Sequence, residues 1–208
     1  DGIPLDATDL LLAWAAASDG DGGFDAVPTG LAASDGLVGF DESERAIEVR
    51  FDGIVNDAAT ALDVAVPAHV LGQLALGIED PMEAKKAVAD AIRDEDAEAL
   101  AGLAEAWNGD FRISPDAETE DRLLLSSGPY RISAVTTADA GGLRVELVAN
   151  PRYSGARKPS YERIALTEMV DADQLAALGD TIDVAQFGST EMRRKPVTAL
   201  ERRDHSTI

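Results

Sequence analysis

The sequence contains no cysteine, and this absence excludes several kinds of site at once. Disulfide frameworks, thiolate zinc sites, iron–sulfur clusters and thiol nucleophiles all need the missing side chain. Long apolar runs are also missing, because the longest one, around residues 10–17, is far shorter than the ~20 residues that cross a bilayer. The first residues, Asp1 to Pro4, include neither an initiator Met nor a signal-peptide pattern, so we expect the chain to be part of a longer protein.

Positive charge is scarce: 18 Lys and Arg face 39 Asp and Glu, and the formal net charge is −21 at pH 7. Nucleic-acid phosphates and anionic lipid repel such a polyanion unless it carries a compact basic patch. The densest basic stretches, residues 193–195 and 202–203, are typical of a solvated helix face. No such patch is visible in the sequence, so we expect no nucleic-acid partner, no binding to a membrane surface and no direct insertion into a bilayer. With 45% hydrophobic and 27% charged residues, the chain should bury the core of one or two domains.

Histidine is limited to His69 and His205, which lie far apart and in no spacing that places two metal ligands on one helix face. A structural or surface role is the favoured interpretation of each. A serine hydrolase would need a Ser beside a His, and Ser126-Ser127-Gly128 lacks the G-x-S-x-G elbow. No glycine loop of either common phosphate-binding type is present.

Carboxylates at Asp19, Asp21 and Asp25 superficially suggest a calcium loop. A twelve-residue loop counted from Asp19 ends at Gly30 instead of a bidentate Glu, so an acidic turn is favoured. On the residues alone the chain is an acidic α/β module without an evident catalytic centre. We expect no enzymatic activity, no cofactor and no bound metal.

Hydrophobic periodicity predicts both helices and strands, so an α/β fold with a mixed sheet is favoured over a helical bundle. Asp6 should cap the first helix, with Asp9 reaching back as in a capping box. An acidic, proline-containing stretch at 114–121 marks the best candidate for a subdomain boundary. The predicted helices are 7–18, 57–63, two between Pro81 and Trp107 divided near Asp94, 173–178 and 189–203; the predicted strands are 46–51, 130–135, 143–148, 164–166 and 182–185; residues 24–40 are predicted to be irregular.

Four sets of residues, in chain order, carry a resemblance to one family. They are Asp1-Gly2-Ile3-Pro4-Leu5-Asp6-Ala7-Thr8-Asp9-Leu10, then residues 47–51 with Val66-Pro67-Ala68-His69-Val70, then Ser127-Gly128-Pro129-Tyr130-Arg131-Ile132, and Ala149-Asn150-Pro151-Arg152-Tyr153-Ser154-Gly155 with Lys158-Pro159 and Ile164. They resemble segments of the family 5 extracytoplasmic solute-binding proteins, which serve peptide, nickel and oligosaccharide ABC importers. Residues 175–185 are similar to a later segment of the same family. Ser154 stands where the family usually has Trp, and Ser126-Ser127 replaces the usual Gly-Thr, which weakens assignment to a ligand subclass.

The resemblance implies a two-lobed clamp of the periplasmic-binding-protein type II fold, of which this chain would be part of one lobe. Residues 1–117 would form the peripheral subdomain of lobe one. Residues 118–208 would form part of its central α/β sheet, up to the hinge. Most residues that clamp the ligand would then lie outside this chain.

The same resemblance implies a solute receptor without catalysis that presents its ligand to an ABC permease. An oligopeptide is the expected solute, and the expected location is extracytoplasmic, as a cell-surface lipoprotein or in the periplasm. The main alternative is a sensory or protein-interaction module that reuses the lobe without transport, and an enzyme with a non-His centre ranks last. A signal peptide with a lipidated Cys upstream would favour the receptor, and fusion to a signalling domain would favour the sensor.

The family's cleft segments correspond loosely to residues 24–29 and 60–63 of this chain. By this comparison the candidate ligand-binding residues are Phe24, Asp25, Thr60 and Asp63. The structural alternative is that Phe24 anchors a loop and Asp63 is a solvated acid.

Overall fold

A computed structural model of the chain describes residues 1–18, 23–27, 29–41, 46–51, 53–55, 62–115, 119–138, 141–168 and 182–184. The chain divides into two compact units. The first comprises residues 1–113 and 119–127, and the second comprises residues 114–118 and 128–208. The assignment of residues 1–117 and 118–208 to two subdomains of one lobe stays a prediction.

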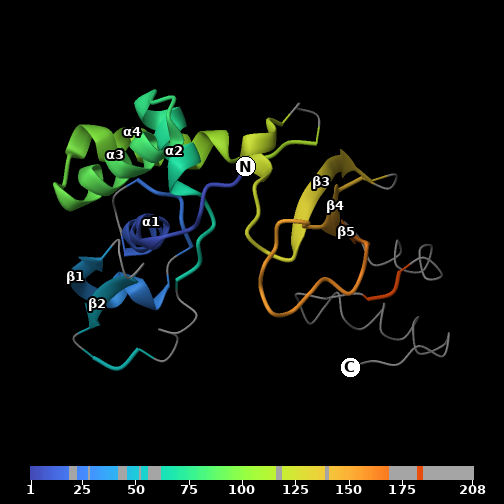
Figure 1. Cartoon of the computed structure of the whole chain (residues 1–208), viewed down its shortest axis with the longest axis horizontal. Coiled ribbons are helices and arrows are strands. Elements are labelled where there is room, and N and C mark those ends of the chain that lie inside the picture. The colour runs from blue at the N-terminus through green and yellow to red at the C-terminus, as the bar shows by residue number, and fades with distance from the viewer. Residues whose placement is uncertain are drawn as a thin grey trace. The chain divides into compact units, whose positions relative to one another are not determined.

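The first unit begins with helix α1 (Ala7–Ser18), whose start is fixed by the predicted capping box. The backbone N–H of Thr8 donates to Asp6 Oδ1 at 2.9 Å, and the N–H of Asp6 donates to Asp9 Oδ2 at 2.9 Å. Together these bonds satisfy amides that would otherwise lack partners at the helix start. The capping box and the end of the helix at Ser18 are therefore confirmed. Figure 1 shows α1 between a β-hairpin and the other three helices of this unit.

Three further helices follow: α2 (Ala68–Leu76), α3 (Pro81–Arg93) and α4 (Ala97–Asp110). Asp80 and Asp96 cap α3 and α4 by accepting two backbone N–H bonds each, and Pro81 occupies the first turn of α3 as predicted. The two helices predicted between Pro81 and Trp107 are thus confirmed. Helix α2 was missed, because its short apolar sequence after Pro67 gives little periodicity.

The core of the first unit lies where these four helices meet. Gly72 of α2 sits so close to α3 that a Cβ added there would lie 2.6 Å from the carbonyl oxygen of Ala84. No side chain fits in that space, so glycine sets the distance between α2 and α3. The largest fully buried apolar side chains are those of Leu11, Leu12, Val70, Leu71, Val88 and Leu103.

The β-hairpin of the first unit pairs β1 (Ser34–Asp41) with β2 (Ala46–Phe51). Strand 46–51 is confirmed with the predicted bounds. The irregular structure predicted for residues 24–40 is wrong over its second half, which forms a 3₁₀ turn (Gly30–Ala33) and then β1. The glycines at 36 and 39 hid this strand, and its register is irregular at these positions.

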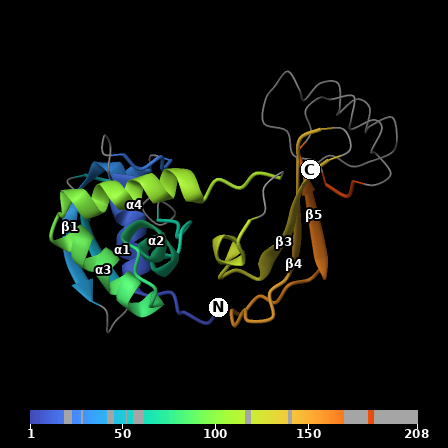
Figure 2. The ribbon, with the colours of Figure 1, turned by 90° about the horizontal axis from the view of Figure 1, so that it is seen from above.

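The described strands of the second unit form one antiparallel sheet in the order β3 (Tyr130–Thr137), β4 (Leu143–Ala149) and β5 (Arg163–Thr167). Figure 2 shows the three strands side by side. The register aligns Ile132, Leu147 and Ile164 on one apolar face. The opposite face is polar and carries Glu146, which forms ion pairs with Arg144 and Arg163.

The molecule therefore belongs to the mixed α and β class, with helices and sheets segregated as in α+β folds. Three of the four strands predicted from residue 130 onward are confirmed, but the mixed sheet is not, since every pairing among the described strands is antiparallel. The connections from β3 to β4 and from β4 to β5 contain no described helix, and short connections join antiparallel neighbours. Residues 182–184 are described without a strand, so that prediction is wrong there. The helices predicted at 57–63 (except residues 62–63, which are not helical), 173–178 and 189–203 lie outside the described residues.

Candidate functional site

The most concentrated polar chemistry of the first unit is a buried ion cluster around Lys85 of α3. The Lys85 side chain is 2% exposed, and its Nζ lies 2.6 Å from Asp9 Oδ2 and 3.0 Å from Asp6 Oδ2. It also donates to the carbonyl oxygen of Pro4 at 2.7 Å. All three ammonium protons thus have an acceptor, which a buried cation needs in order to stay charged.

Asp9 connects this cluster to α2. Its Oδ1 accepts the backbone N–H of Ala68 at 2.9 Å, and its side chain is 1% exposed. Pro67, the N-cap of α2, provides no side-chain cap, so Asp9 supplies the acceptor from outside the helix. A carboxylate at a helix N-terminus is further stabilised by the helix dipole.

His69 extends the cluster toward the first residue of the chain. Its Nε2 lies 2.6 Å from Asp1 Oδ2, and within the described structure its buried Nδ1 has no partner. Burial lowers the pKa of His69, and the nearby Lys85 ammonium acts in the same direction. A neutral ring with its proton on Nε2 fits this geometry, because a second proton on Nδ1 would be buried without an acceptor.

These contacts hold the extended segment Asp1–Asp6, here called the strap, against α2 and α3. The cluster pairs a His with a carboxylate, but, apart from His69 Nδ1, its side-chain polar atoms described above bond to another member or to the backbone. Its evident role is to position the strap. No group of three or more His, Asp or Glu side chains that could hold a metal occurs within the part of the chain that the structure describes.

Lys85 was not predicted to be a site residue, although the sequence carries a signal for it. Lys85 lies on the apolar face of α3 with Ala84, Val88 and Ile92, where a lone lysine interrupts an otherwise hydrophobic stripe. A cation on a buried face requires a carboxylate partner. Sequence alone did not indicate that the partners would be Asp6 and Asp9, some eighty positions away.

The candidate ligand-binding residues Phe24 and Asp25 lie together, but helix α4 engages both. The ring of Phe24 packs edge-on against Trp107 with centroids 5.6 Å apart. The Asp25 carboxylate pairs with Arg112 at 3.0 Å, and the backbone N–H of Asp25 donates to Asn108 Oδ1 at 2.7 Å. Phe24 is half-buried and Asp25 is exposed, so these contacts fit the role of a loop anchor.

The other two candidates are not brought together with this pair. Asp63 is exposed, and only its backbone carbonyl has a described bond, which it accepts from the N–H of Ala65 at 3.1 Å. Thr60 lies outside the described residues. No predicted ligand residue lines the hollow described next.

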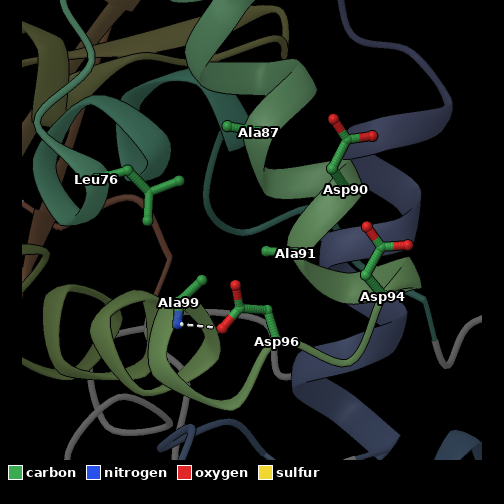
Figure 3. Close-up of a pocket in the computed structure, with 7 residues that line it drawn as sticks. All are labelled: Leu76, Ala87, Asp90, Ala91, Asp94, Asp96 and Ala99. Atoms are coloured by element: carbon green, nitrogen blue, oxygen red, sulfur yellow. Dashed lines mark hydrogen bonds between the residues drawn. The ribbon is translucent and has the colours of Figure 1, made fainter.

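A shallow hollow of about 280 Å³ opens between the end of α2, the outer face of α3 and the start of α4 (Figure 3). Its lining is Leu76, Ala87, Asp90, Ala91, Asp94, Asp96 and Ala99. Small apolar side chains and three carboxylates thus surround it. Asp90 pairs with Lys86, and Asp96 caps α4 through the N–H of Ala99 at 3.2 Å, so two of the three acids have structural roles.

In the second unit, Asn150 fixes the loop that follows β4. Its side chain donates to the carbonyl of Gly128 at 3.0 Å, and its backbone N–H donates to the carbonyl of Pro129 at 2.9 Å. Its Oδ1 accepts the N–H of Arg152 at 3.1 Å, as in an Asx turn. The loop is therefore tied at its first residue to the start of β3.

The chain is similar to relatives named as uncharacterized lipoproteins, one from Mycobacterium bovis and two from strains of Mycobacterium tuberculosis. Each is 30% identical over 166 residues, which cover 76% of this chain and 27% of the relative. The chain thus spans about a quarter of the length of the curated relatives that it matches. No family model and no solved structure matches the chain. No helix among the described residues is long and apolar enough to span a membrane.

Proposed function

We propose that the intact protein is an extracytoplasmic solute-binding receptor of an ABC importer, tethered as a lipoprotein, and that this chain supplies part of its first lobe. The expected solute is an oligopeptide. The lipoprotein names of the relatives support the location, and their greater length leaves room for the second lobe.

The observation that carries the proposal is that the resembling segments pair in space. In the first unit the segment that begins at Asp1 contacts the one around Pro67, through Asp1 with His69 and Asp9 with the N–H of Ala68. In the second unit the segment around Asn150 bonds to the Gly128-Pro129 segment. Short motifs that arose by coincidence would have no reason to be contact partners.

A clamp of this kind binds solute by closing two walls around it, and closure buries ligand surface that one wall leaves in water. A peptide on one wall still loses translational and conformational freedom. We therefore expect the 208-residue chain alone to bind peptides no more tightly than about millimolar, and the full-length protein to bind in the micromolar range, a difference of at least ~4 kcal/mol.

Isothermal titration calorimetry with a tri- to pentapeptide library on both proteins tests this. Micromolar binding by the full-length protein alone supports the receptor. Full-length protein that binds no peptide contradicts the peptide receptor and favours the sensory or interaction module. Equal micromolar binding by the 208-residue chain would show that it holds a complete site, and the one-wall argument would be wrong.

A further inference from the structure

The connection between β4 and β5 has the opposite charge from the rest of the chain. From Asn150 to Arg163, the first residue of β5, the chain carries four cations, Arg152, Arg157, Lys158 and Arg163, against one acid, Glu162. In the whole chain, acids outnumber bases by 39 to 18. This stretch was not predicted to be a basic patch, because prolines, serines and tyrosines separate its cations.

Three of these cations have no carboxylate partner within the described structure. Arg163 pairs with Glu146, but no ion pair involves Arg152, Arg157 or Lys158, and all three are exposed. In a chain with so many acids, internal partners for them would be easy to provide. Their charges are therefore available to an anionic partner outside the fold.

The loop is held in one shape by bonds that do not use the charges of the two arginines. Asn150 fixes its start, and the N–H of Tyr161 donates to the hydroxyl of Tyr130 at 3.0 Å near its end. Lys158 bonds to the carbonyl of Tyr153 at 3.3 Å, with its ammonium 5.8 Å from the centre of that ring. The cations are therefore displayed from a preorganised loop, which reduces the entropy lost on binding.

Tyr161 adds an amphipathic aromatic to the same surface, since its side chain is 68% exposed. Exposed tyrosines beside basic residues are typical of surfaces that lie at the headgroup level of a membrane. Here the loop that comprises residues 150–162 is called the basic loop.

We propose that the basic loop docks on anionic lipid headgroups of the membrane to which the protein is tethered. The proposal rests on the extracytoplasmic lipoprotein assignment made above. A lipid anchor keeps the protein near the surface, and a basic patch is one kind of second signal that strengthens and orients such an attachment. The strongly acidic remainder is repelled from the same surface, so the loop determines which side of the second unit faces the bilayer.

The experiment tethers the full chain through a C-terminal hexahistidine tag to nickel-chelating lipid vesicles. Because the sequence has no cysteine, Ala156→Cys labels the basic loop at one position, and Glu105→Cys labels the exposed face of α4 as a control. The vesicles carry a headgroup nitroxide quencher and contain either phosphatidylcholine alone or added phosphatidylglycerol. We expect the loop label to be quenched on the vesicles that contain phosphatidylglycerol and not on those of phosphatidylcholine alone. High salt should reverse this quenching, and the α4 label should not be quenched on either vesicle.

The test variant is R152Q/R157Q, which leaves Lys158 and the bonds of the loop in place. Each cation near an anionic surface raises the equilibrium constant for contact with that surface about fivefold, so the loss of two cations should lower this constant about 25-fold. The matched control K86Q/R112Q removes the same charge from exposed residues of the first unit and should leave the quenching unchanged.

Any of three results would overturn the proposal. They are equal quenching of the loop label on both vesicle types, no quenching on the phosphatidylglycerol vesicles, and a double variant that is quenched like the parent chain. If soluble polyglutamate binds the basic loop as tightly as the vesicles do, the partner is an acidic protein and the lipid assignment is wrong. Peptide calorimetry uses no vesicles, so failure of the receptor function and failure of lipid docking are told apart.

Discussion

The substitution Lys85→Met tests whether the ion cluster holds the first unit together. Methionine retains the length and most of the volume of the lysine stem but removes the ammonium group. The Asp9 carboxylate, 1% exposed, then loses its cation, and the carbonyl of Pro4 loses its donor. The contact of Asp1 with His69 and the capping box of α1 stay in place.

Removal of one partner from a buried ion pair costs about 3–5 kcal/mol, because the remaining charge stays buried without compensation. Asp6 is one-quarter exposed and loses less, so Asp9 dominates the cost. Small domains are stable by about 5–15 kcal/mol, so this change removes a large share of the total. Helix α2 should also loosen, since Asp9 supplies its N-terminal acceptor.

Urea denaturation followed by tryptophan fluorescence measures the effect in the correct unit. Both tryptophans, Trp14 and Trp107, lie in the first unit, on α1 and α4. The control is Lys86→Met, the same substitution one residue along α3, where the side chain is 72% exposed and pairs with Asp90 at the surface. That surface pair should contribute at most about 0.5 kcal/mol.

The reasoning fails if Lys85→Met costs less than about 1 kcal/mol, or if both variants cost the same. A double-mutant cycle with Asp9→Asn then isolates the pair itself. Since the asparagine side chain carries no charge, the loss caused by Lys85→Met should be clearly smaller in the Asp9→Asn background. Equal losses in the two backgrounds would show that Lys85 acts through packing instead.

At Gly72, His69 and Asn150 a single group determines local stability. Gly72→Ala should lower the free energy of unfolding, measured by urea denaturation, by about 1–3 kcal/mol because its Cβ meets the α3 backbone. The control Gly102→Ala, whose Cβ makes ordinary contacts, should be neutral or stabilising by up to about 1 kcal/mol. The opposite order would refute the close-packing argument. Because the pKa of His69 is lowered in the folded state, the unfolded chain binds more protons than the folded chain below pH 6.5, so the free energy of unfolding should fall as the pH drops through this range. His69→Gln should flatten this pH dependence. An unchanged slope in the variant would contradict the prediction. Asn150→Ala removes the bond to Gly128 and should increase amide hydrogen exchange at the start of β3, which an unchanged exchange rate would disprove.

Much of the fold could be predicted from local pattern. The capping box, the caps of α3 and α4, and the alternation of strand 46–51 each depend on residues a few positions apart, where sequence is most informative. Helix α2 and strand β1 were missed for physical reasons. The N-terminal acceptor of α2 is Asp9, some sixty positions away, and the β1 register is broken where its glycines fall.

The candidate site was predicted less well, since it depends on contacts that no spacing reveals. Phe24 and Asp25 were selected by resemblance to cleft segments, and the structure shows what holds them, namely Trp107 and Arg112 of the first unit. Lys85 was overlooked because lysine is normally a surface residue. A rule that marks any charged residue inside an apolar helical stripe would have found it.

The segments that carry the family resemblance supply scaffold contacts, and this explains why they are recognisable at all. Asp9 uses its two carboxylate oxygens on Lys85, the N–H of Asp6 and the N–H of Ala68. Asn150 uses its amide N–H and its carbonyl oxygen on backbone groups. A solute could contact Asp9 only by breaking a buried bond, and Asn150 only by breaking the bonds that fix its loop. For the solute receptor proposed above, selection of the solute must then come from side chains outside these segments.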